Sequence, residues 1–169
     1  ICFTYLLSIL YLQVHLYSST NCSEFKTCKE TIKGRNPLCG WCFFGKKATR
    51  KSKCTGSNDP NNWLSSLGEC VKLRVEPAGT KVNTEISITV TASDNIPKNR
   101  TGDTYDCVFL GSSFMKSTRA RRNGNVFTCR TPNVSSHDIN AKLEIRVTPS
   151  NVKLAETDFL FYQCNTFKT

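Results

Sequence analysis

The sequence has few of the residues on which most catalytic and metal centres depend. Its 169 residues include two histidines and one methionine, which leaves little material for a histidine-based metal site or active site. No metal or cofactor is expected. Acidic residues are also scarce: 13 of them stand against 23 lysines and arginines, giving a formal net charge of +10. That charge permits contact with sulfated glycans, anionic surfaces or nucleic acid, and indicates none of them in particular.

The chain also lacks a hydrophobic run long enough to span a membrane. Residues 1–20 are rich in apolar side chains, but they include no initiator methionine, basic region or small-residue cleavage site, which argues against a signal peptide. Apolar and polar residues alternate over 12–17. This favours a strand remnant or unrelated upstream sequence, with a truncated signal peptide as the alternative.

Cysteine, by contrast, is abundant. The chain has 10 cysteines, too many for most cytosolic enzymes, because reducing buffers there prevent pairing. Six of them crowd into a turn-rich stretch that shows no sustained periodicity: Cys22, Cys28, Cys39, Cys42, Cys54 and Cys70. So short a segment buries too little apolar surface to offset its chain entropy, and disulfides usually supply the difference. We predict a small disulfide-rich domain over 21–70, with a core of Trp41, Trp63, Phe25 and Phe43.

After Cys70 the pattern changes to that of strands. Apolar side chains occupy every second position in 85–91 and 141–147, and turn-forming residues separate these from further short runs at 71–75, 105–110, 125–130 and 158–162. This spacing predicts an antiparallel β-sandwich over 71–162. Cys107 and Cys129 fall in two of its strands and are expected to pair.

Three Asn-x-Ser/Thr triplets begin at Asn21, Asn99 and Asn133. One such triplet is common by chance, but three in a cysteine-rich chain agree with passage through the secretory pathway. The chain is therefore predicted to be secreted or to be part of an ectodomain, with these asparagines as N-glycosylation sites.

The end of the chain repeats its first cysteine motif. The Cys-x-x-Phe-Lys-Thr of residues 22–27 recurs at 164–169, which indicates a repeating array. A second small cysteine-rich domain is expected to start at 163–169. Cys2 and Cys164 have no assigned partner.

Residues 22–70 resemble the plexin-semaphorin-integrin (PSI) domain. The motifs that carry the resemblance are Cys22-x5-Cys28, Cys39-Gly40-Trp41-Cys42, Thr49-Arg50-Lys51-Ser52-Lys53-Cys54, and Trp63 followed by Cys70. By arithmetic alone, six cysteines can pair in 15 ways. The resemblance selects Cys22–Cys39, Cys28–Cys70 and Cys42–Cys54. The family's PSI domains carry one more bridge, and here Thr31 and Ala48 stand at its two positions.

The following segment looks like the immunoglobulin-like (IPT/TIG-type) domain of plexins. Its motifs are Tyr105-x-Cys107-Val108-Phe109, Cys129-Arg130-Thr131-Pro132 and Phe159-Leu160-Phe161-Tyr162-Gln163-Cys164. In plexins this domain runs directly into a second PSI domain, whereas no second PSI domain follows in the hepatocyte growth factor receptor family. The array over 21–169 therefore resembles a plexin ectodomain.

This resemblance implies a non-enzymatic, extracellular stalk segment of a single-pass plasma-membrane receptor. Its disulfide-stapled domains would form a rigid spacer in contact with neighbouring ectodomain modules. The parent protein would bind semaphorins through a sema domain outside this chain, and signal through small GTPases in axon and cell guidance. The alternative is a secreted or cell-surface module that binds heparan sulfate or acidic partners.

The basic residues behind that alternative are Lys46, Lys47, Arg50, Lys51 and Lys53. A solvated loop is the preferred interpretation, and an electrostatic binding patch is the alternative. No aromatic residue interleaves with them, so nucleic-acid binding is not expected.

Other chemical motifs are weak. Cys39-Gly40-Trp41-Cys42 resembles a redox or zinc motif. A redox motif normally opens a helix after a strand, and that pattern is not found here. Zinc thiolates need a reducing compartment, so structural cysteines are favoured. His137-Asp138 lacks a nucleophile in an elbow-type context and is predicted to be a polar loop. Arg119-Ala120-Arg121-Arg122 fits a furin-type cleavage pattern next to Asn123-Gly124. We expect a charged, exposed hairpin loop there, with cleavage as the alternative.

Overall fold

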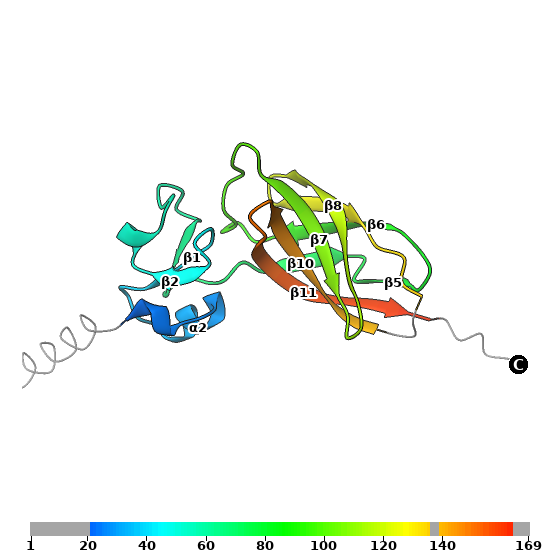
Figure 1. Cartoon of the computed structure of the whole chain (residues 1–169), viewed down its shortest axis with the longest axis horizontal. Coiled ribbons are helices and arrows are strands. Elements are labelled where there is room, and N and C mark those ends of the chain that lie inside the picture. Colours follow the sequence, from blue (N-terminus) through cyan, green and yellow to red (C-terminus); the bar gives the residue numbers. More distant parts are fainter. Residues whose placement is uncertain (1–20, 136–138, 164–169) are drawn as a thin grey trace, which may run out of the picture. The chain divides into compact units, whose positions relative to one another are not determined.

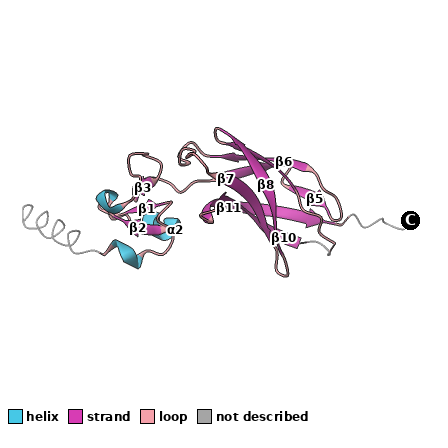
Figure 2. Cartoon of the chain, turned by 45° about the horizontal axis from the view of Figure 1, so that its top comes forward, coloured by secondary structure: helices cyan, strands magenta, loops and turns pink. Residues whose placement is uncertain are grey.

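The computed structural model describes residues 21–135 and 139–163. The chain divides into two compact units between Cys70 and Val71, and the first runs from blue to green-cyan in Figure 1. Short helices and strands make up the first unit, whereas strands dominate the second (Figure 2). The predicted fold class is confirmed: a small disulfide-rich domain is followed by an immunoglobulin-like β-sandwich.

The first unit consists of helices and strands that are too short to produce a helical or strand periodicity in the sequence. Its helices are η1 (Cys22–Glu24), α2 (Cys28–Lys33) and η2 (Lys51–Lys53), and its strands are β1 (Gly40–Cys42), β2 (Lys47–Thr49) and β3 (Trp63–Ser65). The strands form one antiparallel sheet in the order β2-β1-β3. A cap starts α2, because the Thr27 hydroxyl accepts a hydrogen bond from the Glu30 amide.

The second unit is one continuous arrangement of eight strands, in the order β4-β6-β9-β8-β7-β10-β11-β5. They are β4 (Leu73–Glu76), β5 (Gly79–Lys81), β6 (Ser87–Ala92), β7 (Thr104–Leu110), β8 (Met115–Asn123), β9 (Val126–Arg130), β10 (Ile139–Thr148) and β11 (Val152–Tyr162). All pairings are antiparallel except that of β5 with β11. The strands form two sheets, one of β4, β6 and β9 and the other of β7, β10, β11 and β5. β8 belongs to both, because residues 115–120 pair with β7 and 121–123 pair with β9.

The core of this unit lies between the two sheets. Ile88 and Val90 on β6 are buried, as are Leu143, Ile145 and Val147 on β10, so the inward faces predicted from alternation are the ones observed. Three phenylalanines pack edge to face beside them, with ring centroids 5.1–5.8 Å apart: Phe109, Phe159 and Phe161. The Cys107–Cys129 disulfide joins β7 to β9 within this core.

The furin-type motif lies in a strand, and the expectation of an exposed hairpin loop was wrong. Residues 119–122 belong to β8, and the turn follows at Gly124, which has a positive φ of 59°. Ala120 is buried against the core, while Arg119 forms an ion pair with Asp106 on β7. Most side chains of β8 are polar on both faces, so its sequence has no alternation that would predict a strand.

Arg122 fixes the end of this strand. Its guanidinium donates to the hydroxyl of Tyr105 (2.7 Å) and to the carbonyls of Pro97 and Gly124 (2.8 Å each). It also lies 5.1 Å from the centroid of the Tyr105 ring. Burial raises the pKa of the Tyr105 phenol, against the opposing effect of Arg122. The protonated hydroxyl donates in turn to Asn99 (2.8 Å).

We therefore expect the folded chain to resist a furin-type convertase at Arg122. A protease needs the substrate backbone free to bind in an extended form. The backbone of these residues is paired with β7 and β9, and it becomes free only when β8 detaches from both neighbours. Gel analysis under reducing conditions should show an intact chain after incubation, whereas the reduced and denatured chain is cut. Equal cleavage rates for the two forms would contradict the strand assignment.

Candidate functional site

Three disulfides hold the first unit together, and they join the pairs that the family resemblance implies. Cys22 in η1 is bonded to Cys39, which precedes β1. Cys28 at the start of α2 is bonded to Cys70, the last residue of the unit. Cys42 in β1 is bonded to Cys54, which follows η2. η1 and α2 are thereby linked covalently to other parts of the unit, and η2 is linked through the residue that follows it.

The Cys39-Gly40-Trp41-Cys42 motif is structural in this fold. Cys39 and Cys42 belong to different bridges, so they do not form the internal pair of a redox motif. Gly40 is required by packing, because a side chain there would collide with the Trp63 ring and the Leu64 carbonyl oxygen. Because Gly40 has no side chain, the Trp63 ring can lie across β1.

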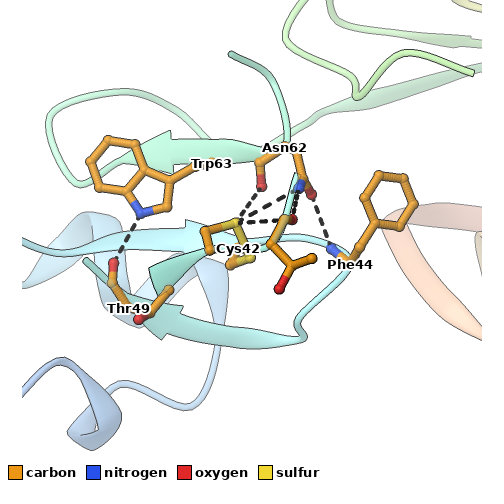
Figure 3. The surroundings of a disulfide bond; sticks show 7 residues. Cys42, Phe44, Thr49, Asn62 and Trp63 are labelled. Atoms are coloured by element: carbon orange, nitrogen blue, oxygen red, sulfur yellow. Dashed lines mark hydrogen bonds between the residues drawn. A yellow bond between two sulfur atoms is a disulfide. The ribbon is translucent and has the colours of Figure 1, made fainter. Parts of the chain in front are cut away.

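The two tryptophans are half-buried rather than enclosed. Trp63 donates from Nε1 to the Thr49 carbonyl oxygen on β2 (2.9 Å), and this bond ties β3 to the far strand of the sheet (Figure 3). Trp41 packs against a small buried cluster of Cys22, Cys39 and Ala48, together with Phe25. Phe43 is 2% exposed, so it is the most buried of the four aromatic residues expected in the core.

Asn62 has a structural role that the sequence does not predict. It is 1% exposed, and its side chain accepts from the Phe44 amide (3.2 Å) and donates to the Thr55 carbonyl (2.7 Å) beside the Cys42–Cys54 bridge (Figure 3). Its backbone oxygen accepts from Phe43. Several asparagines occupy the same turn-rich run, and nothing in the sequence distinguishes Asn62 from them.

Thr31 and Ala48 occupy the positions of the missing bridge. Thr31 in α2 is 0% exposed and Ala48 in β2 is 3% exposed, and α2 packs against β2. The Thr31 hydroxyl satisfies its hydrogen-bonding need by donating to the Thr27 carbonyl (2.9 Å). Both positions of the bridge that the resemblance implies therefore carry small, buried side chains, and neither leaves an unpaired thiol.

The basic residues are exposed to solvent, as the preferred interpretation expected, but they do not lie on a single loop. Lys47 lies in β2, while Lys51 and Lys53 lie in η2. Lys46 adopts a positive φ of 52° in the turn before β2. Lys47, Arg50 and Lys53 line a single depression, and Asn21 and Ser23 of the η1 region line it as well.

All three candidate glycosylation asparagines are exposed. The Asn21 side-chain oxygen caps η1 by accepting from the Ser23 amide (3.2 Å). The Asn99 oxygen accepts from the Tyr105 hydroxyl. Both contacts use the amide oxygen, whereas a glycan is attached to the amide nitrogen, so both are compatible with modification.

Within residues 21–135 and 139–163, no group of histidine, cysteine or acidic side chains has a metal-binding arrangement. No helix in the same part of the chain is long and apolar enough to cross a membrane. His137-Asp138, the apolar segment 1–20 with Cys2, and Cys164 lie outside the described residues.

A Gly40→Ala substitution should destabilise the first unit by about 1–3 kcal/mol, because the added methyl collides with the Trp63 ring and the Leu64 carbonyl oxygen. Thermal unfolding followed by tryptophan fluorescence would measure the loss. The same substitution in a Trp63→Leu background should cost less, because the ring that it meets is gone. Equal losses in both backgrounds would show that the ring is not what excludes a side chain at residue 40.

Restoring the missing bridge is expected to stabilise the unit. The double variant Thr31→Cys/Ala48→Cys closes a short loop, for which chain entropy predicts a gain of about 3 kcal/mol. Non-reducing peptide mapping should find the new crosslink, and the melting temperature should rise relative to each single variant. Two free thiols in the oxidised double variant would mean that these positions are not arranged for a bridge.

Two family models match the chain. A plexin repeat (PSI) model matches residues 21–71, and a TIG domain model of the plexin type matches residues 76–162. The second match alone covers about half of the chain.

Individual relatives agree with these matches. Plexin-A4 of Danio rerio is 28% identical over 158 residues, covering 88% of this chain and 8% of the relative. Human Plexin-A3 is 25% identical over 167 residues, covering 93% and 9%. The chain thus spans less than a tenth of the length of these relatives.

Solved structures show the same fold. The full extracellular region of Plexin A4, in a structure that covers domains 1 to 8, superposes with a TM-score of 0.72 at 22% identity, covering 86% of this chain and 16% of that one. A second structure of that region, covering domains 1 to 10, gives a TM-score of 0.69. Together with the two domain matches, these likenesses show that the chain belongs to the plexin family, as a PSI domain followed by a TIG domain of the extracellular region.

Proposed function

We propose that this chain is a stalk segment that sets the spacing between the ligand-binding head of a plexin-like receptor and the membrane. The observation that supports this most directly is the set of three bridges within residues 21–70. Each bridge restricts the unfolded chain and contributes about 2–4 kcal/mol. A unit built this way keeps its shape under load better than its small core alone allows.

The parent receptor is proposed to be a single-pass plasma-membrane protein that binds semaphorins and signals in axon and cell guidance. The relatives are plexins, and the chain corresponds to only 8–9% of their length. The sema domain and the signalling region would therefore lie outside these residues. We assign the segment a mechanical role and no catalytic one, since PSI and TIG domains of plexin ectodomains are non-catalytic receptor modules.

We propose the following domain limits for the segment. The PSI domain occupies 21–70 and the TIG domain 71–162, which agrees with the division into compact units at Cys70. Residues 1–20 precede the PSI domain, and 163–169 begin the next one. Neighbouring ectodomain modules would be the direct contacts of this segment.

Binding of heparan sulfate through the basic residues is a second candidate function. One observation favours it: Lys47, Arg50 and Lys53 line a common depression. Exposed cations gathered in one place attract sulfate groups more strongly than the same charges dispersed over a surface.

The spacer role is tested by loosening the connection between the two units in the parent receptor. A Gly/Ser linker of about 20 residues after Cys70 should leave semaphorin affinity within about twofold and reduce signalling at least about fivefold, because a flexible chain of that length transmits no fixed geometry. Surface binding and a signalling readout in the same cells would measure both.

The matched control places the same linker at Gly102, an exposed loop position within the TIG unit that leaves the connection unchanged. Full signalling from the receptor with the linker after Cys70 would overturn the spacer role. Loss of semaphorin binding in that variant would assign the segment to the binding head instead.

A further inference from the structure

The depression on the PSI unit brings a candidate glycosylation site and a group of cations together. Its lining comes from two parts of the unit: the start of η1, and β2 with the turn into η2. The complete set is Asn21, Cys22, Ser23, Lys47, Ala48, Thr49, Arg50 and Lys53. No carboxylate is among these residues.

The electrostatics favour an anionic ligand. Lys47 and Lys53 are exposed and form no ion pair with any carboxylate in the described part of the chain. Like charges around one concave surface repel each other, and an anion placed between them relieves that repulsion. Sulfate groups repeated along a linear polysaccharide have the charge and the spacing to contact several such cations at once.

Asn21 lines the same depression. Its side-chain oxygen is held by the Ser23 amide, while Nδ2 is the atom that takes a glycan. In that reaction Nδ2 loses a proton and bonds to the sugar C1 of a lipid-pyrophosphate-linked oligosaccharide, and the C1–pyrophosphate bond breaks. The cap on η1 is kept, because the amide oxygen is not altered.

We propose that an N-linked glycan on Asn21 closes this depression to sulfated polysaccharides, so that the PSI unit binds them only when Asn21 carries no glycan. The proposal rests on the second candidate function above. Even the core of an N-linked glycan is larger than the depression beside which it is anchored. It excludes a second polysaccharide from Lys47 and Lys53 by volume, without any change in the fold.

The test compares secreted full-length chains made in a glycosylating host, with immobilised heparin as the probe. Ser23→Ala removes the sequon while leaving Asn21 and its cap in place, because only the Ser23 backbone amide takes part in the cap. Ser135→Ala is the matched control, since it removes the sequon at Asn133 in the TIG unit. Mass spectrometry establishes the occupancy of Asn21 in each preparation.

A second pair of variants, made in the Ser23→Ala background, locates the binding site. Lys47→Ser/Lys53→Ser removes two cations of the depression. Lys29→Ser/Lys33→Ser removes the same charge from exposed positions on α2, outside the depression. Net charge is therefore equal in the two double variants, and only its position differs.

The expected result is that Ser23→Ala binds heparin at least about fivefold more tightly than the glycosylated chain, with Ser135→Ala unchanged. Lys47→Ser/Lys53→Ser should reverse the gain, and Lys29→Ser/Lys33→Ser should keep most of it. Equal and measurable binding by the glycosylated chain and Ser23→Ala, or an unmodified Asn21 in the starting protein, would overturn the glycan's role while leaving heparin binding in place. Absence of binding in both forms would overturn heparin binding itself. Equal weakening by the two double variants would show that heparin binding depends on net charge, and the assignment of the depression as its binding site would be wrong.

Discussion

Covalent crosslinking is the constraint on which the PSI unit depends. Its strands are three residues long, and one of its buried clusters consists of two half-cystines and an alanine, with Phe25 and Trp41 against it. Apolar burial on this scale does not offset the entropy of ordering 50 residues. The bridges lower that entropy in the unfolded chain, and they also supply part of the buried surface themselves.

The TIG unit is stabilised by a different balance of forces. Its long strands carry a contiguous interior in which Phe109, Phe159 and Phe161 meet edge to face, and one disulfide adds to a core that is already extensive. β8 depends on this core rather than creating it, since it contributes mainly Ala120 to the interior. Arg122 then secures the strand with hydrogen bonds and a cation–π contact.

This difference bears on the proposed role. A spacer requires that its parts keep their shape, and the two units reach this by crosslinking in one case and by packing in the other. The shape of the PSI unit is therefore sensitive to redox conditions, and so is the arrangement of its surface charges. Its basic residues lie on short, bridged elements, so their positions are fixed by the same bonds that hold the fold.

The sequence by itself determined the family, the fold class and the inward faces of β6 and β10, because cysteine spacing and period-2 alternation are local signals. It did not predict β8, because the side chains of that strand are mostly polar and show no apolar–polar alternation. It did not predict the role of Asn62 either, because the hydrogen bonds of that residue join segments distant along the chain. Only the tertiary structure placed Arg122 against Tyr105, and Asn21 in the same depression as Lys47 and Lys53. Such arrangements arise from contacts between segments far apart in the sequence, and no single segment carries a pattern that encodes them.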